Sequence, residues 1–157
     1  MRADRKIVNR AELIQRVQIA RRNGQRVVFT NGCFDIVHAG HIDLLEKAKS
    51  CGDILIVALN SDSSIRKIKG PDRPIVNETD RARLIAAIET VDFVTFFNEE
   101  TPIEILREIQ PDVIVKGSDY RKEEIVGYDF IPEVKVIPLV PEQSTSKIIE
   151  KIRRIST

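Results

Sequence analysis

The chain has 157 residues, of which 42% are hydrophobic and 31% are charged. These proportions predict one globular domain with a sizeable apolar core, and they exclude a disordered or fibrous protein. With 25 Lys and Arg against 24 Asp and Glu the formal charge is +1, so the overall charge gives no reason to expect nucleic acid or an anionic membrane as a partner.

The N-terminal segment, the longest apolar run and the two cysteines indicate the cellular compartment. The longest apolar run, Ile54 to Leu59, is far too short to span a bilayer, and residues 1–6 lack the apolar core of a secretory signal. Cys33 and Cys51 have neither the density of a disulfide framework nor the spacing of zinc ligands. We therefore expect a cytoplasmic protein with no membrane partner.

Five short runs of β-branched, aromatic and other apolar residues alternate with five helical patterns. The expected helices, in chain order, are Arg10 to Asn23, His41 to Cys51, Thr79 to Glu89, Pro102 to Ile109 and Ser144 to Ile155. The expected strands are Val27 to Thr30, Ile54 to Asn60, Phe93 to Phe97, Val113 to Lys116 and Val134 to Pro138. Nearly continuous apolar strands are usually covered on both faces, so the alternation predicts an α/β fold: a Rossmann-like five-stranded parallel sheet with helices on both faces.

Two segments, Ser61 to Glu78 and Gly117 to Pro132, show no clear periodicity. Gly and Pro interrupt the first of them between Lys69 and Pro74, which indicates a loop. Both segments follow strands, and open parallel sheets bind ligands at the carboxyl ends of their strands. We therefore expect both loops to lie beside a ligand site.

The most informative residues come directly after the first strand, in Asn31-Gly32-Cys33-Phe34-Asp35-Ile36-Val37-His38-Ala39-Gly40-His41. A helix N-terminus offers unpaired backbone N–H groups and the positive end of the helix dipole, so it suits a phosphate. His38 and His41 are the only histidines in the sequence, and residues three apart share one face of a helical turn. Gly32 lets the backbone approach a ligand closely. The pattern favours a phosphate site.

Two other interpretations of the histidine pair stay open. The imidazoles could be held by backbone groups alone, as structural residues. A His-x-x-His pair can also chelate a transition metal, but the sequence has no further histidine and Asp35 is the nearest additional ligand. Replacement of either histidine by alanine tests a catalytic role, because unchanged turnover in a correctly folded protein would exclude it.

The string from Gly32 to His41 resembles the signature of the nucleotidylyltransferase superfamily, in which a His-x-Gly-His motif opens the helix after the first strand. The resemblance extends over nearly the whole chain and is greatest to the adenylyltransferases of ADP-heptose synthesis. The segments that carry it are Leu59 to Asp62, Lys69-Gly70, Asp72 to Pro74, Asp80-Arg81, Val91-Asp92, Thr101-Pro102, Lys116 to Tyr120 and Ser144 to Ser146.

Adenylyltransferases of that family join ATP and D-glycero-β-D-manno-heptose 1-phosphate, giving ADP-heptose and pyrophosphate for lipopolysaccharide synthesis. The resemblance implies the same reaction here, with Mg²⁺ held through the triphosphate and no metal bound by protein side chains. In-line attack of a sugar phosphate oxygen on the α-phosphorus requires positioning and charge neutralisation rather than a protein nucleophile. Many family members carry an N-terminal sugar kinase. The resemblance implies a single-domain form that works with a separate heptose kinase and forms a dimer or higher homo-oligomer.

On this resemblance, the catalytic residues are His38, His41 and Lys69. The nucleotide-binding residues are Thr30, Asn31, Gly32, Cys33, Phe34, Gly40, Gly117, Asp119, Ser144, Thr145 and Ser146. Arg73 and Arg81 are candidates for contact with the sugar phosphate or the triphosphate. Each assignment has a plainer alternative: a lone Lys or Arg is commonly a solvated surface charge, Ser at a helix start is a good N-cap, and the Gly117–Asp119 turn could be stabilised by Asx chemistry alone.

Two other functions are considered. Cytidylyltransferases of the superfamily, which act on glycerol 3-phosphate or choline phosphate, carry an Arg-Thr-Glu-Gly-Ile stretch and an Arg-Tyr-Val-Asp element. Those places read Leu139 to Gln143 and Glu89 to Asp92 here, so the arginines are missing and ATP is favoured over CTP. A nucleotide-binding regulatory module without catalysis could dispense with a histidine, yet both are present.

Overall fold

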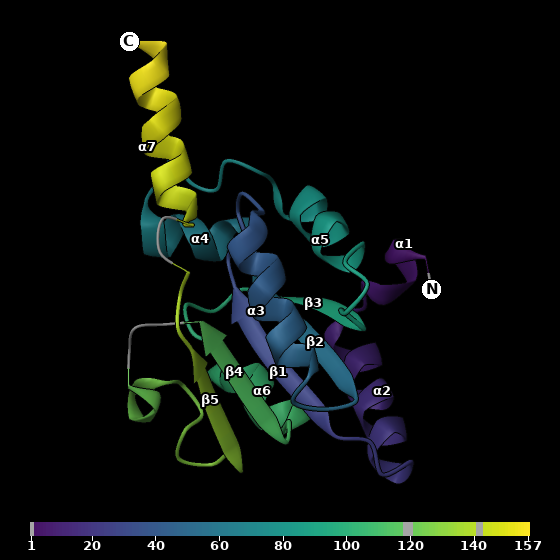
Figure 1. Ribbon diagram of the computed structural model, residues 1–157. Coiled ribbons are helices and arrows are strands. Elements are labelled where there is room, and N and C mark those ends of the chain that lie inside the picture. Colours follow the sequence, from purple (N-terminus) through teal and green to yellow (C-terminus); the bar gives the residue numbers. More distant parts are fainter. Residues whose placement is uncertain (1, 118–120, 141–142) are drawn as a thin grey trace.

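The computed structural model describes residues 2–117, 121–140 and 143–157 (Figure 1). Its elements, in chain order, are α1 (Ala3–Lys6), α2 (Arg10–Arg22), β1 (Val27–Gly32), α3 (Ala39–Lys49), β2 (Ile54–Asn60), α4 (Asp62–Lys69), α5 (Glu78–Ala86), β3 (Phe93–Phe97), α6 (Ile103–Ile109), β4 (Val113–Gly117), the short 3₁₀ helix η1 (Lys122–Glu124), β5 (Glu133–Ile137) and α7 (Thr145–Ser156).

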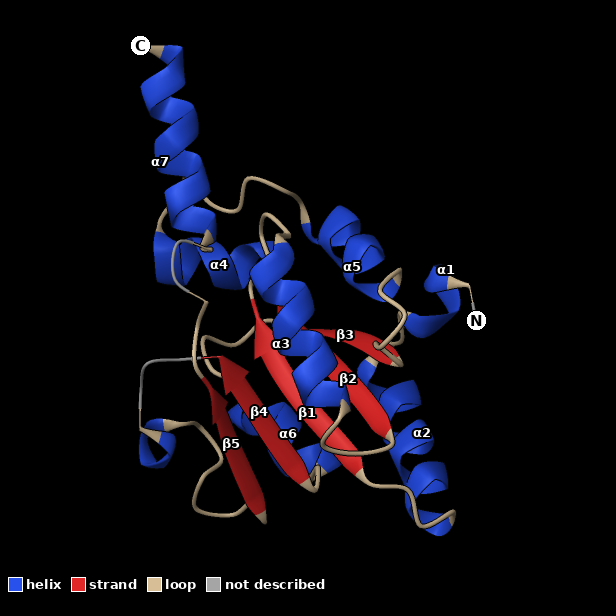
Figure 2. Ribbon diagram, viewed as in Figure 1, coloured by secondary structure: helices blue, strands red, loops and turns tan. Residues whose placement is uncertain are grey.

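The five strands form one parallel sheet in the order β3-β2-β1-β4-β5, which confirms the expected architecture (Figure 2). From β1 the chain moves outward to β2 and β3, and it then crosses to the other side of β1 for β4 and β5. The strand order therefore reverses between β1 and β4. In a parallel sheet a crevice opens outside the carboxyl ends of two such strands, and it is the usual place for a ligand.

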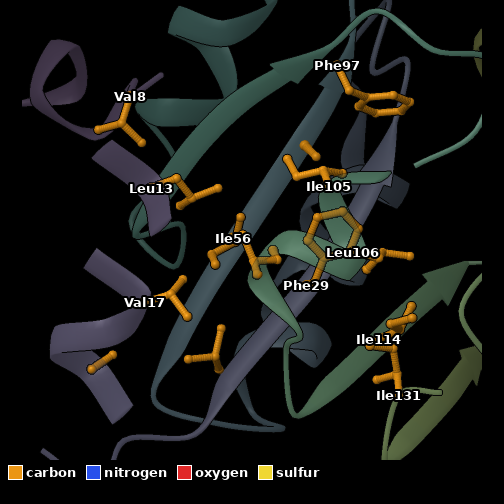
Figure 3. Packing of buried hydrophobic residues seen from close by; sticks show 14 of the residues in the cluster. Val8, Leu13, Val17, Phe29, Ile56, Phe97, Ile105, Leu106, Ile114 and Ile131 are labelled. Carbon is orange, nitrogen blue, oxygen red and sulfur yellow. The ribbon is translucent and has the colours of Figure 1, made fainter. Parts of the chain in front are cut away.

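One face of the sheet is covered by α2 and α6. Phe29 of β1 and Ile56 of β2 pack there against Leu13 and Val17 of α2 and Leu106 of α6 (Figure 3). All five side chains are at most 2% exposed, and burying a side chain of this size stabilises the fold by about 1.5–3 kcal/mol.

The opposite face is covered by α3 and α5. Val28 is adjacent to Phe29 in β1, and because side chains alternate along a strand it points to this second cluster. Leu45 of α3 and Ile85 of α5 pack there with Val28 and with Val57 of β2. The two clusters hold β1 between two layers of helices, so the end of β1 is a rigid support for the residues that follow it.

The segment from Ser61 to Glu78 showed no clear periodicity in the sequence, yet in the structure it contains the helix α4. The Ser61 side chain accepts a hydrogen bond from the N–H of Ser64 and caps the helix, while Ile65 is fully buried. The glycine and prolines that suggested a loop lie after the helix, which ends at Lys69 and has Gly70, with a φ of 97°, as its C-cap residue.

Smaller differences concern element bounds. β1 runs on to Gly32, α3 begins at Ala39 rather than His41, and α5 ends at Ala86 rather than Glu89. The earlier start of α3 makes His38 its N-cap residue. Within the described residues, no helix has the length and apolar character needed to cross a membrane.

Candidate active site

Two adjoining cavities lie at the edge of the sheet where β1 and β4 end. The helix-end cavity, of about 220 Å³, is lined by His38, Gly40, His41, Asp43, Leu44, Lys69, Gly117, Ile137, Pro138, Leu139, Val140, Gln143, Ser144, Thr145 and Ser146. The cationic cavity, of about 340 Å³, is lined by Asn31, Gly32, Cys33, Phe34, Asp35, His41, Asn60, Ile68, Lys69, Arg73, Glu100, Lys116 and Thr145. His41, Lys69 and Thr145 line both cavities and so mark their junction.

The two histidines stack on each other at the N-terminus of α3. Their ring centroids are 3.8 Å apart and their planes differ by 26°. The Nδ1 of His38 accepts a hydrogen bond from the N–H of Gly40 at 3.1 Å, and the Nδ1 of His41 accepts one from the N–H of His38 at 3.3 Å. A neutral imidazole that accepts at Nδ1 carries its proton at Nε2. The backbone therefore orients both rings, and each Nε2–H is the donor available to a ligand.

The pKa values of both histidines lie below the ordinary range. Burial lowers the pKa of His38. Burial lowers the pKa of His41 to about 4, with further contributions from the nearby charges of His38 and Lys69. Both rings are therefore neutral hydrogen-bond donors at pH 7, and a bound polyanion would shift each pKa upward.

Close contacts hold the loop between β1 and α3 over the histidines. A Cβ at Gly40 would come within 3.0 Å of the His38 ring, so only glycine leaves room for the ring to fold back over the helix start. Phe34 has a φ of 47°, and its ring lies 5.0 Å from that of His41 at an interplanar angle of 51°. A Cβ at Gly32 would meet the Phe34 ring at 3.0 Å.

The N-terminus of α7 faces the same cavity as the N-terminus of α3. Ser144 caps α7, because its Oγ accepts a hydrogen bond from the N–H of Lys147 at 3.2 Å. The hydroxyl of Thr145 donates to the carbonyl of Ile36 at 3.3 Å and so links α7 to the loop after β1. Two helix N-termini thus converge on the helix-end cavity, which concentrates positive potential there.

In the cationic cavity, Asp35 holds the loop that follows α4. This carboxylate is 1% exposed and accepts hydrogen bonds from Arg73 Nε at 2.8 Å, from the N–H of Ile75 at 2.9 Å and from the N–H of Val76 at 2.8 Å. Burial raises the pKa of Asp35, but these hydrogen bonds together with the Arg73 charge hold it below its ordinary value. The buried Arg73 Nη2 has no acceptor in the described part of the chain, so it remains a donor for a ligand.

Arg81 has a structural role that the sequence did not indicate. The residue is 0% exposed, its Nη1 donates to the carbonyls of Cys33 and Asn60 at 2.7 and 2.9 Å, and its Nε donates to the carbonyl of Val76 at 3.0 Å. Its Nη2 forms an ion pair with Asp62 at 2.8 Å. Arg81 therefore joins the ends of β1 and β2 to the loop before α5, and the expected phosphate contact stays a prediction.

The remaining expected residues divide into two groups. One group lines the cationic cavity and consists of Asn31, Gly32, Cys33 and Phe34. The other group lines the helix-end cavity and consists of Gly40, Gly117, Ser144, Thr145 and Ser146. Thr30 is 0% exposed and lines neither cavity, so its expected contact with the nucleotide stays a prediction. The expected contact at Asp119 lies outside the described residues.

Several residues of the site were not found from the sequence. The helix-end cavity has an apolar wall made by Leu44 of α3 and by the segment 137–140 after β5. Asn60 and Lys116 line the cationic cavity from the ends of β2 and β4. Apart from Leu44, these residues lie at the carboxyl ends of strands, and that position is the signal that would have identified them.

A metal interpretation of the histidine pair finds little support in the structure. Within residues 2–117, 121–140 and 143–157, no three His, Cys, Asp or Glu side chains are grouped so as to hold a metal ion. Asp35, the candidate third ligand, is instead engaged by Arg73 and two backbone amides.

The cavities at the strand-order reversal are accompanied by a clear family match: the chain belongs to the cytidylyltransferase-like family, whose model matches residues 29–157, and it is therefore a nucleotidyltransferase. More particularly, the chain is similar to proteins named bifunctional protein HldE. It is 54% identical over 133 residues to that of Wolinella succinogenes, 50% identical over 153 residues to that of Koribacter versatilis and 53% identical over 133 residues to that of Helicobacter pylori.

These matches cover most of the chain but a minor part of each relative. They include 85%, 95% and 85% of this chain, and 28%, 32% and 29% of the respective relatives. The chain therefore spans about a third of the length of the HldE proteins that it matches. Among solved structures, a lipopolysaccharide core biosynthesis protein from Thermoplasma volcanium GSS1 matches with a TM-score of 0.65 and 29% identity, covering 74% of this chain and 99% of that one.

Proposed function

We propose that this protein transfers the adenylyl group of ATP to D-glycero-β-D-manno-heptose 1-phosphate, giving ADP-heptose and pyrophosphate for the lipopolysaccharide core. The stacked His38–His41 pair, placed between the N-termini of α3 and α7, is the observation that carries the proposal. Similarity to the HldE proteins, and to a solved protein whose name places it in lipopolysaccharide core biosynthesis, supports the pathway.

The residues that line the helix-end cavity suit a nucleoside triphosphate. Its apolar wall, which includes Leu44 and Leu139, suits a purine base, and Gly117 allows the nucleotide to approach the end of β4. At the polar end, the hydroxyl and backbone groups of residues 144–146 suit the β- and γ-phosphates. This orientation places the α-phosphate beside His38 and His41.

In this arrangement the two imidazoles stabilise the transition state electrostatically. Each Nε2–H donates to an α-phosphate oxygen on which charge accumulates as the fifth bond to phosphorus forms. Their Nδ1 atoms are already engaged by backbone N–H groups, so the rings need no reorganisation during the reaction. One preorganised donor of this kind contributes roughly 3–4 kcal/mol to transition-state stabilisation.

The acceptor is expected in the cationic cavity. The attacking oxygen must approach the α-phosphorus from the side opposite the departing pyrophosphate. Because the pyrophosphate would lie at the N-terminus of α7, that opposite side is the cationic cavity, where Lys69 and the unused Arg73 Nη2 can contact phosphate oxygens.

Mg²⁺ fits this site through the substrate rather than through a protein cage. The described residues offer no cluster of acidic ligands, and Mg²⁺ is commonly bound by substrate phosphates and water. When bound, Mg²⁺ would supply charge neutralisation on the phosphates. We further propose that a separate kinase supplies the sugar 1-phosphate and that the reaction occurs in the cytoplasm, where ATP is abundant. We also propose that the protein forms a homodimer or higher oligomer, which sedimentation would test.

Turnover tests the proposal directly. The protein is incubated with Mg²⁺, heptose 1-phosphate and each nucleoside triphosphate in turn, and pyrophosphate is measured. We expect release with ATP; release with CTP alone would favour a cytidylyltransferase, and no release with any triphosphate would favour a binding module. His38→Ala and His41→Ala should each lower kcat by about 100- to 1000-fold in protein with an unchanged unfolding midpoint.

A further inference from the structure

Lys116 lies where the strand order reverses, and the proposed reaction has so far given it no role. It is the second-last residue of β4, and its Nζ donates a hydrogen bond to the carbonyl of Asn31, near the end of β1, at 2.8 Å. It lines the cationic cavity and also a smaller adjoining cavity of about 180 Å³ beside Gly32 and His41. The ammonium therefore lies under the loop that leads to the histidine pair.

The charge on Lys116 lacks a counter-ion in the described part of the chain. An ammonium has three N–H donors, and among the described residues only the one directed at Asn31 has an acceptor. Of the two carboxylates that line the same cavity, Asp35 is engaged by Arg73, and Glu100 forms no ion pair with Lys116. Burial lowers the pKa of Lys116, because a cation withdrawn from water is disfavoured until an anion joins it.

Arg73 lines the same cavity and has a second uncommitted donor. Its Nε is held by Asp35, whereas its Nη2 is buried without an acceptor within the described residues. Two cationic groups that retain unused N–H donors in one cavity form a suitable cradle for a phosphate.

We propose that Lys116, together with Arg73, binds the phosphate of the acceptor. This inference rests on the proposed function. The acceptor is favoured over the nucleotide because Lys116 lines the cationic cavity together with Lys69 and Arg73 and does not line the helix-end cavity. The smaller cavity that it also lines adjoins the helix-end cavity through Leu44, Gly117 and Leu139, so the kinetic test below measures both substrates.

Steady-state kinetics separate the two substrates. Lys116→Met removes the charge at similar volume, and Lys116→Gln keeps an N–H donor for the Asn31 carbonyl while also removing the charge. Both variants should raise the KM for heptose 1-phosphate by about 10- to 100-fold and leave the KM for ATP within about twofold. The exposed Lys122→Met is the matched control and should change neither value. If Lys116→Gln behaves like the wild type, or if both KM values rise together, the role of Lys116 is structural and the inference is wrong.

A binding measurement keeps this inference separate from the proposed function. Heptose 1-phosphate is titrated into the protein by calorimetry in the presence of a non-hydrolysable ATP analogue. Binding that is lost in both Lys116 variants and kept in Lys122→Met supports the inference even if the wild type shows no turnover, which would refute only the proposed function. Equal binding by all variants, or no binding to the wild type, overturns the inference whatever the turnover.

Discussion

Replacement of Asp35 by asparagine should destabilise the folded protein by about 3–5 kcal/mol, the usual cost of removing one partner from a buried ion pair. The carboxylate is 1% exposed and accepts hydrogen bonds from Arg73, Ile75 and Val76. An asparagine side chain has one acceptor oxygen in place of two, and its amide NH₂ would face donors. Arg73 would also be left as a buried cation without its counter-ion.

Urea and thermal unfolding measure this cost. In a chain of this size, the loss corresponds to a decrease in Tm of roughly 6–20 °C. Asp43→Asn is the matched control, because Asp43 forms an exposed ion pair with Lys47 at 2.6 Å on the surface of α3. Removal of that pair should change the free energy of unfolding by less than about 1 kcal/mol.

The pH dependence provides the critical test of the reasoning. Because the pKa of Asp35 in the folded protein lies below its ordinary value of 3.8, the ionised carboxylate stabilises the fold above that pH, and this stabilisation is lost as the pH falls through the folded-state pKa. The difference between the wild type and Asp35→Asn should therefore be constant down to about pH 5 and decrease in stronger acid. A loss below about 1 kcal/mol at neutral pH, or a difference that does not change with pH, would refute the argument.

Three further substitutions test the geometry of the site. Gly40→Ala should displace the His38 ring and lower kcat by about 10- to 100-fold, and the loss should disappear in a His38→Ala background; if it persists there, the added methyl group acts elsewhere. Ser144→Ala removes the cap of α7, so the KM for ATP should rise about fivefold, and a KM at the wild-type value would contradict the phosphate assignment. Lys69→Met should lower kcat/KM by about tenfold or more, whereas the exposed Lys67→Met on the same helix should not; equal kinetics for the two variants would make Lys69 an ordinary surface charge.

The sheet, its strand order and the histidine motif could be predicted because each leaves a local pattern. Continuous apolar runs such as residues 54–59 mark buried strands, and the motif around His38 combines residue type with a helix start. α4 was missed because Gly70 and the prolines after it attracted the loop assignment. Ser61 as a cap, with apolar residues at Ile65 and Ile68, was the signal for that helix.

Burial and contacts between distant segments could not be predicted from the sequence. Arg81 was assigned to a phosphate because an arginine near a motif resembles a ligand contact, yet its partners, among them Cys33 and Asn60, lie 48 and 21 residues away along the chain. Thr30 was placed with the nucleotide because it adjoins the motif, and its complete burial could not be read from the sequence. Lys116 received no role because its missing counter-ion is visible only after folding.

Helix α7 has no buried residue, although its first turn contributes Ser144, Thr145 and Ser146 to the helix-end cavity, and it projects away from the sheet (Figure 1). Its amide protons should therefore exchange with solvent through local fraying rather than through global unfolding. Occupancy of the cavity by a triphosphate would then slow exchange in the first turn of α7 while the core strands keep their rates. Affinity for the nucleotide can thus be tuned by substitutions along this helix with little effect on the stability of the domain.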